Sequence, residues 1–339
     1  MVAATRPRIE IVAEIGLLIY PDCQLAAVYG LTDLFRIANE WAARSESQAQ
    51  KRGPAPFVRV SHWRADEAGG GIDCVYDSLA ETPHRLTHVI APPSIVMPEK
   101  MRSMPVAAGW MNARHAEGST LCSVCAGAFV LAETGLIDGR RVTTHWAFAR
   151  QLAERFPGVE LAEEQMVIDD GDIMTAGGIL AWTDLGLTLV ERLMGPSIML
   201  ATARFLLVDP PRRSQRPFSQ FVPRFDHGDT AILRVQQHVH AHADEPSAVA
   251  ELAGLASLTE RTFLRRFAKA TGLRPVEYLQ QMRIAKAREL LELTANTVDQ
   301  IGFSVGYGDP AAFRKLFQRL TGLTPNLYRQ RYGLAARRS

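Results

Sequence analysis

The chain has 339 residues, of which 47% are hydrophobic and 22% are charged, a composition typical of a globular protein with room for two domains. This composition excludes a disordered or fibrous chain. Residues 1–208 carry 18 Lys and Arg against 24 Asp and Glu, a net charge of −6, whereas residues 228–339 carry 16 against 10, a net charge of +6. The second half has the charge that binding to nucleic-acid phosphates requires.

The beginning of the chain shows no targeting or membrane-spanning pattern. Arg6 and Arg8 precede an apolar run that Glu10 and Glu14 interrupt, and no stretch approaches the 18 consecutive apolar residues of a transmembrane helix. We therefore expect a cytoplasmic protein without a membrane partner.

Strands and helices alternate along the first part of the chain. Residues 9–20, "IEIVAEIGLLIY", read as a buried strand, and residues 24–44 then carry apolar residues at helical spacing. Further strands are predicted at 57–63, 72–75, 88–91 and 120–124, and further helices at 99–116 and 126–136. This alternation predicts an α/β domain.

Cys125 lies between the last of these strands and the helix that follows, with only the small Ala126 and Gly127 after it. A sharp strand-to-helix turn of this kind is where a nucleophile elbow holds one side chain over the edge of a sheet. A helix amino terminus stabilises a thiolate, so the position suits a reactive cysteine. A buried apolar cysteine in a tight turn fits the same spacing.

Residues 9–195 resemble the ThiJ/PfpI branch of the class I glutamine amidotransferase-like superfamily, most closely the isocyanide hydratases and the GlxA-like regulators. The similarity lies in "SVCAGAFVLAETGLIDGRRVTTHWAF" and in "TAGGILAWTDLGLTLVERLMG". The resemblance implies a doubly wound, flavodoxin-like sheet with helices on both faces. In the family's enzymes it also implies an elbow cysteine, an acid from the first helix region and backbone N–H donors from a Gly-rich turn.

The chain departs from this catalytic pattern at three positions. Ala27 stands where the hydratases have their acid, Pro93 replaces a glycine of the N–H-donating turn, and Ala126 follows the cysteine where the peptidase-like branch has a histidine. The elbow therefore lacks a proton-transfer partner and one oxyanion donor. We expect no catalysis and no cofactor, with Cys125 as a vestigial nucleophile position.

We expect this elbow to form part of a pocket for a small effector. The expected pocket residues are Cys125, Ala126, Pro93, Ser94 and His145, with Asp22, Trp182 and Asp184 as further polar or stacking candidates. His145 fits a structural or pocket role better than that of a base. The domain is thus expected to be a ligand sensor.

The middle of the chain links two expected domains, 1–208 and 228–339. Residues 196–208 read as a helix with more apolar surface than a solvated helix needs, which makes it a candidate for dimer contact. Residues 209–227 hold four Pro and four Arg without periodicity and read as an interdomain linker. His238 and His242 then share a helix face, but no third ligand follows at matching spacing, so no metal site is expected.

The same unit occurs twice near the carboxyl terminus, about 50 positions apart. Phe263 and Phe267 recur as Phe313 and Phe317, and "TGL" followed by Pro and Tyr recurs at the same offset. Residues 247–270 and 297–320 each read as two helices joined by a short turn, which is a helix-turn-helix. The expected N-caps are Ser247 and Thr259 in the first unit and Asp309 in the second.

Residues 228–331 resemble the DNA-binding domain of AraC/XylS-type transcription regulators, in "RTFLRRFAKATGLRPVEYLQQMRIAKARELL" and "VDQIGFSVGYGDPAAFRKLFQRLTGLTPNLYRQRY". The resemblance implies that a helix over 276–293 joins two subdomains, whose second helices enter successive major grooves about 34 Å apart. The residues assigned to DNA are Arg261, Thr262, Leu264, Arg265 and Arg266, then Pro310, Ala311, Arg314 and Lys315. Because arginine can bind guanine through two hydrogen bonds, Arg261 and Arg265 are expected to carry most of the sequence reading.

Together these features predict an α/β doubly wound sensor domain followed by an all-α double helix-turn-helix domain. We expect a homodimeric transcriptional activator that binds double-stranded promoter DNA and a small nitrogen-containing effector, with RNA polymerase as a further partner. Two alternatives remain open: a cysteine-dependent hydratase or amidase with an appended DNA-binding domain, and a redox sensor that uses Cys122 and Cys125. Against the second, Cys122 is expected to point into the core.

Overall fold

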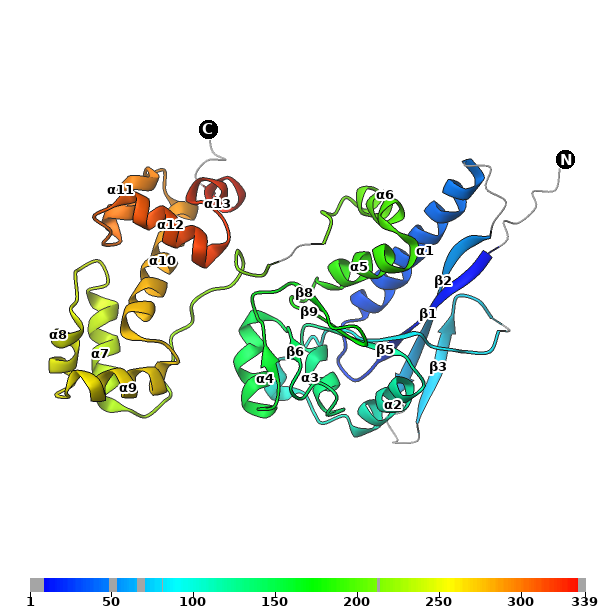
Figure 1. Ribbon diagram of the computed structural model, residues 1–339, viewed down its shortest axis with the longest axis horizontal. Helices are drawn as coiled ribbons and strands as arrows, with labels where there is room; N and C mark the ends of the chain where they lie inside the picture. Colours follow the sequence, from blue (N-terminus) through cyan, green and yellow to red (C-terminus); the bar gives the residue numbers. More distant parts are fainter. Residues whose placement is uncertain (1–8, 49–53, 66–70, 81, 212–213, 335–339) are drawn as a thin grey trace. The chain divides into compact units, whose positions relative to one another are not determined.

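The computed structural model describes residues 9–48, 54–65, 71–80, 82–211 and 214–334 (Figure 1). Arg6 and Arg8, on which the expected absence of a targeting segment partly depends, lie outside these residues. The chain separates into two compact units, Met1–Gln215 and Arg216–Ser339. The division falls inside the segment 209–227, and the buried apolar clusters of the two units are separate.

The first unit contains a seven-stranded sheet in the order β3-β2-β1-β4-β5-β9-β8. Strands β1, β2, β4, β5 and β9 are parallel, while β3 and β8 run antiparallel at the two edges. In chain order the parallel strands are arranged 2-1-3-4-5, the flavodoxin-like order, so the predicted fold class is confirmed. The strands are β1 (Ile9–Ile19), β2 (Ala55–Ala65), β3 (Ile72–Asp77), β4 (His88–Ala91), β5 (Thr120–Val124), β8 (Val167–Asp169) and β9 (Ile173–Ala176), with a separate pair β6 (Arg141–Val142) and β7 (Glu160–Leu161).

Helices cover both faces of this sheet. Figure 1 shows α1, α5 and α6 together on one side and α2 and α3 on the other. Because both faces are covered, β1 is buried without interruption from Ala13 to Ile19, as expected for a central parallel strand. The helices are α1 (Leu25–Gln48), α2 (Pro105–Ala116), α3 (Gly127–Ala132), α4 (Ala149–Arg155), α5 (Trp182–Met194) and α6 (Pro196–Leu206), with short 3-10 helices η1 (Pro98–Lys100) and η2 (Trp146–Phe148).

The single helix predicted over 99–116 is wrong in its first part. The helix η1 ends at Lys100, residues 101–104 are not helical, and α2 begins at Pro105. Proline restricts the residue before it to extended conformations and is accepted at the first helical position, so it starts a helix here instead of continuing one.

The second unit consists of helices and has two cores. Phe263, Phe267 and Tyr278 pack in the first, and the corresponding Phe313, Phe317 and Tyr328 pack in the second. The Phe267–Tyr278 and Phe317–Tyr328 ring centroids are both 5.4 Å apart in edge-on arrangements, so the sequence repeat is a repeat of packing. The helices are α7 (Thr230–Ala241), α8 (Val249–Leu255), α9 (Glu260–Thr271), α10 (Pro275–Leu293), α11 (Val298–Ser304), α12 (Pro310–Thr321) and α13 (Pro325–Tyr332).

The ends of the two helix-turn-helix units follow capping rules, with one exception. Thr259 accepts the N–H of Thr262, and Asp309 accepts the N–H of Ala311, so both predicted N-caps are confirmed. The cap predicted at Ser247 is wrong, because α8 begins one residue later. The Glu251 carboxylate reaches back to the Ala248 N–H at 3.1 Å and takes over the capping contact.

Candidate functional site

Helix α9 presents arginine side chains to solvent. It buries Phe263 and Phe267 against the first core and leaves Arg261, Leu264 and Arg265 exposed. Among the described residues, neither of these two arginine side chains has a hydrogen-bonding or ionic partner. Their guanidinium groups are therefore available to a ligand without breaking an existing contact.

Helix α12 presents the equivalent surface of the second repeat. Ala311 and Lys315 are exposed, and Pro310 is half-buried at the first helical position. The Arg314 guanidinium forms an ion pair with Asp299 of α11, so its direction is set by the neighbouring helix. The two repeats thus differ, since α9 carries unpaired arginines and α12 carries a paired arginine beside a lysine.

Two residues of the candidate DNA surface are engaged within the protein. Arg266 donates from Nε and Nη2 to the Asp229 carboxylate, at 2.9 and 2.7 Å. Asp229 is also the N-cap of α7, and the Arg266 guanidinium lowers the pKa of its carboxyl. The Thr262 hydroxyl lies 3.0 Å from that of the N-cap Thr259. These contacts fasten α9 to the start of α7 and to its own first turn.

The strand-to-helix elbow predicted at Cys125 is confirmed in the first unit. Cys125 has a φ of 55°, a left-handed conformation that non-glycine residues seldom adopt, and it separates β5 from α3. Its N–H donates to the Ala176 carbonyl at 2.8 Å, and its carbonyl accepts the Thr144 hydroxyl at 2.7 Å. A Cβ on Gly127 would lie 2.3 Å from the Ala91 carbonyl oxygen, so only glycine allows α3 to begin this close to β4.

The Cys125 thiol is neutral in this environment. The residue is 1% exposed, and burial raises its pKa to about 12, against a smaller lowering by the Ala126 N–H. The expected benefit of a helix amino terminus is therefore outweighed by desolvation. Burial likewise raises the pKa of Cys122, which lies wholly within the core as predicted from its place in the strand.

The other expected pocket residues meet the elbow from the end of β4. Pro93 and Ser94 are buried, the Gln24 N–H donates to the Pro93 carbonyl at 2.7 Å, and the Ser94 hydroxyl bonds the Asp22 carbonyl at 3.3 Å. Ala126 is fully buried. The edge beside Cys125 is thus closed, because these residues are buried against one another.

His145 follows the residue that holds the elbow, but its ring has a local task. Its Nδ1 accepts the Ala147 N–H at 3.1 Å and caps η2, and the ring lies 5.0 Å from that of Phe148. Burial lowers the pKa of the imidazole, so the ring is neutral at pH 7. Both observations agree with a structural or pocket role.

Exposed apolar side chains surround the closed edge. They come from the start of α1, from the segment after β4 and from the turn after β9, all of which follow carboxyl ends of parallel strands. In open α/β sheets such ends are where ligands and partners bind. The exposed residues are Leu25, Tyr29, Ile95, Met97 and Leu180.

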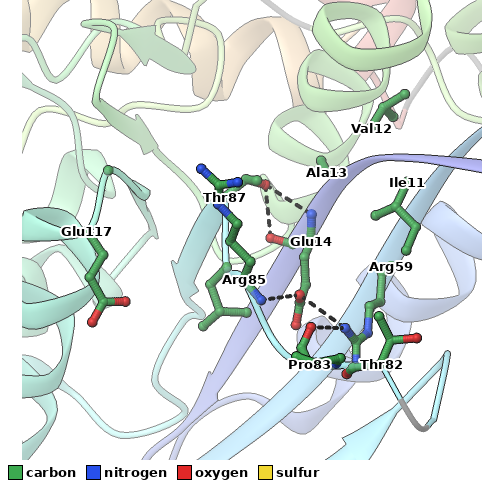
Figure 2. A pocket seen from close by; sticks show the side chains of 12 residues that line it. Ile11, Val12, Ala13, Glu14, Arg59, Thr82, Pro83, Arg85, Thr87 and Glu117 are labelled. Carbon is green, nitrogen blue, oxygen red and sulfur yellow. Dashed lines mark hydrogen bonds and ion pairs between the residues drawn. The ribbon is translucent and has the colours of Figure 1, made fainter.

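A cavity of about 470 Å³ lies at the opposite edge of the sheet (Figure 2). It is lined by the first half of β1 and by the segments that lead into β4 and β5. Arg59, 1% exposed, donates to the carboxylates of Glu14 and Asp77, and Glu14 accepts the Arg85 N–H at 2.7 Å. Because this buried charge network satisfies its own members, we assign it to fold stability.

The sequence gives no reason to single out Gln215, yet its buried side-chain amide is held by several backbone groups. It is 2% exposed, and its Nε2 donates to the carbonyls of Thr144 and Gln165 at 2.8 and 2.9 Å. Its Oε1 accepts the Trp146 N–H at 3.2 Å. A Cβ on Gly177 would lie 2.2 Å from the Gln215 amide nitrogen, so the glycine leaves the space that this amide fills.

A metal site and a membrane-spanning helix can be looked for among the described residues. His238 and His242 stack with ring centroids 4.5 Å apart, and in the part of the chain that the structure describes no three His, Cys, Asp or Glu side chains are grouped as a metal site requires. Across the same residues, none of the helices has the length and apolar character needed to cross a bilayer.

Comparison with known families agrees with this two-part architecture. Residues 252–331 match the helix-turn-helix domain family, and residues 73–192 match the DJ-1/PfpI family. The chain belongs to the HTH-type transcriptional regulators that join a DJ-1/PfpI domain to an AraC-type DNA-binding domain.

Among its relatives is the HTH-type transcriptional regulator GlxA of Rhizobium meliloti, 30% identical over 64% of this chain and 67% of that protein. The HTH-type transcriptional regulator CdhR of Pseudomonas aeruginosa is 29% identical over 67% of this chain and 68% of that protein. An isonitrile hydratase of Pseudomonas putida is 36% identical, but only over 25% of this chain and 36% of the hydratase. The chain is accordingly a DNA-binding transcriptional regulator.

Proposed function

We propose that this regulator activates transcription by inserting α9 and α12 into two successive major grooves of promoter DNA. The observation that carries the proposal is the pair of equivalent helices, each packed through two phenylalanines and each exposing cations on its outer face. A recognition helix held in this way presents side chains to base edges while its core stays unchanged.

The proposed readers of base sequence are Arg261 and Arg265, because their guanidinium groups are exposed and have no partner among the described residues. Each can bind a guanine through two hydrogen bonds, worth about 1–3 kcal/mol of discrimination. In the second groove, Arg314 is oriented by Asp299 and Lys315 is free to reach bases or phosphates. Leu264, Pro310 and Ala311 would contact thymine methyl groups or shape the approach.

Arg266 and Thr262 have a different role in this proposal. Their side chains bond Asp229 and Thr259, so they hold α9 in place while its other residues read DNA. A contact from either to a phosphate would be made in addition to these bonds. We assign them to positioning the helix and not to discrimination between bases.

The DJ-1/PfpI domain is proposed to sense a small metabolite at the elbow edge. Ala27 offers no acid, Pro93 offers no N–H and the Cys125 thiol is neutral, which together favour binding over turnover. A nitrogen-containing effector is supported by the partial similarity to a protein named as acting on an isonitrile. Binding requires the closed edge to open, and a ligand selects whichever arrangement it binds better.

Gln215 offers a route by which this edge could influence DNA binding. The Thr144 hydroxyl holds the Cys125 carbonyl, and the Thr144 carbonyl holds the Gln215 amide. The next residue, Arg216, is held in the second unit, where its carbonyl accepts from Arg288 of α10 at 3.0 Å. We propose that an effector which moves the elbow loosens Gln215, and that the anchored connector passes this change to α10.

The regulator is proposed to act as a homodimer that contacts RNA polymerase. Support for a dimer comes from α6 and its end, where Phe205 is 61% exposed and Leu207 is 92% exposed. A stable interface has an apolar centre, which such side chains can provide. The polymerase contact rests on the proposed role as an activator.

The test begins with a thermal-shift screen of the full chain against amino acids, quaternary amines and isonitriles. A compound that stabilises the protein is then added to a DNA-binding titration, with Cys125→Ser and the exposed Cys74→Ser compared in parallel. We expect altered DNA affinity in wild type and Cys74→Ser, and a weakened response in Cys125→Ser. An effector response that is equal in all three proteins would remove the elbow from the proposal.

A further inference from the structure

The helix α10 lies between the two DNA-binding cores, and its packing changes partner in the middle. Tyr278 and Met282 belong to or pack against the first core, whereas Ile284 and Ala287 belong to the second. Arg283 sits at this changeover. It is the last residue before the helix leaves one core for the other, so its side chain can reach elements of both.

The Arg283 guanidinium is bonded to the loop that precedes the first helix-turn-helix unit and to the turn within the second. Its Nε donates to the Ala243 carbonyl at 2.6 Å and its Nη2 to the Glu245 carbonyl at 2.9 Å, both in the loop between α7 and α8. Its Nη1 donates to the Gly306 carbonyl at 3.0 Å, in the turn between α11 and α12. The same group lies over the Tyr307 ring, 5.3 Å from its centroid.

Gly306 shows how closely the turn between α11 and α12 approaches the loop between α7 and α8 around this arginine. It has a φ of 88°, and a Cβ there would lie 2.4 Å from the Asp244 carbonyl oxygen and 2.9 Å from the Arg283 Cζ. The turn between α11 and α12 therefore lies directly against the loop between α7 and α8. Glycine is required by backbone conformation and by this contact together.

These contacts restrain the position of α12 relative to α9. A guanidinium has five N–H donors in a rigid plane, so one group can hold three carbonyls whose directions differ. A lysine ammonium, on a flexible stem, lacks this fixed fork. Since the carbonyls come from loops that immediately precede α8 and α12, their separation is linked to the separation of the two recognition helices.

We propose that Arg283 is the positioning residue that fixes the half-site spacing accepted by the protein. This inference rests on the proposed insertion of α9 and α12 into two grooves. One added base pair moves a half-site by about 3.4 Å and rotates it by about 35° around the DNA axis. A rigid pair of recognition helices rejects such a change, whereas a pair joined only by α10 and the apolar cores adapts to it.

The experiment measures spacing preference and not affinity alone. An operator is first selected from random duplex DNA with the wild-type full chain. Duplexes with one base pair added or removed between the half-sites, and a duplex with only the half-site read by α9, are then titrated. The proteins are wild type, Arg283→Ala, Arg283→Lys and Lys286→Ala, an exposed α10 residue whose loss removes the same charge.

We expect wild type and Lys286→Ala to lose about tenfold or more in affinity for each changed base pair. Arg283→Ala should bind the selected operator more weakly, should differ by less than about threefold among the spacing variants, and should bind the single half-site as wild type does. Arg283→Lys should lie between them. Unchanged half-site binding shows that the first helix-turn-helix unit of the variant is folded.

Either of two results with Arg283→Ala overturns the inference about Arg283 alone. Arg283→Ala with the same steep spacing profile as wild type removes its positioning role, and so does a loss on the half-site duplex as large as on the full operator. If wild type itself protects one half-site and ignores spacing, the two-groove proposal fails, and the role of Arg283 fails with it.

Discussion

At the scale of single residues, arginines on the same helix have different tasks. Arg261 and Arg265 are exposed without a partner among the described residues, whereas Arg266 is tied to Asp229. The sequence cannot separate them, because all three are basic residues on α9. The distinction depends on where Asp229 lies, and that follows from the packing of α7 beside α9.

Replacing Arg261 or Arg265 with alanine should reduce affinity for a selected operator by about tenfold or more and relax base preference at one position. Each variant loses a guanine contact and no internal bond. Competition binding against operators mutated at single positions measures this effect. Retained preference for every base in both variants would mean that other residues read the sequence.

Arg266→Ala should behave differently and lower stability only slightly, because the Arg266–Asp229 pair is partly exposed and screened by solvent. Arg266 lowers the pKa of the Asp229 carboxyl, so the pair stabilises the fold at neutral pH, and this contribution is lost in acid as the pH falls through the lowered folded-state pKa. Thermal melts of wild type and Arg266→Ala should therefore differ at pH 7 and converge in acid. A constant difference at all pH values would contradict the assigned role.

The cysteines offer a second test at this scale. Because burial raises the pKa of the Cys125 thiol to about 12, the thiolate is a very small fraction of Cys125 at pH 8. Iodoacetamide should label the exposed Cys74 first in the native protein and reach Cys125 only after unfolding, as mass spectrometry of the peptides can follow. Equal labelling rates would show that the elbow opens readily without an effector.

At the scale of elements, the elbow at Cys125 depends on Gly127, because the neighbouring strand β4 leaves no room for a side chain there. Gly127→Ala places a Cβ against the Ala91 carbonyl and should destabilise the first unit by about 2–4 kcal/mol. Gly109→Ala in α2 is the matched control, because it meets nothing within 4 Å and should stabilise by about 0.5–1 kcal/mol. Chemical denaturation measures both. Similar values for the two variants would contradict the close packing of α3 on β4.

Much of this architecture could be predicted from the sequence because the signals are local. The strands 88–91 and 120–124 were predicted with the bounds observed, and the cap at Asp309 follows from its place before Pro310. Ser247 was chosen as a cap by residue type, but Glu251 provides the bond instead. The short strands β6 to β8 were not predicted, since two or three residues show no periodicity.

The candidate site could be predicted only in part, because only some of its features give a local signal in the sequence. The turn at Cys125 follows from the order of strand and helix, yet its burial depends on neighbours distant in sequence. Gln215 and Arg283 gave no local signal at all. Each acts through carbonyls brought together by the fold, and backbone carbonyls carry no mark in the sequence.

At the scale of the whole molecule, the described residues on the two sides of the unit boundary are held by side-chain hydrogen bonds. Gln215 fills a socket in the first unit, and Arg216 and Ser219 are held by Arg288 in the second. A Pro- and Arg-rich composition suggested a simple linker. Composition alone does not show which hydrogen bonds the folded units make with the residues of this segment.

Gln215→Ala should weaken the coupling between effector and DNA. The variant leaves the Trp146 N–H and the carbonyls of Thr144 and Gln165 without this partner, so the effector-dependent change in DNA affinity should fall by about threefold or more. Gln220→Ala, at an exposed position five residues on, is the matched control. A full effector response in Gln215→Ala would exclude this route.

The claim that α9 and α12 read two successive grooves is tested most directly by methylation protection of guanine N7 on a selected operator. We expect two protected major-groove regions on one face of the DNA, about one helical turn apart, for each chain bound. The double variant Arg261→Ala/Arg265→Ala should lose protection in one region and keep it in the other. Protection confined to a single groove in the wild type, or an unchanged pattern in the double variant, would contradict the account.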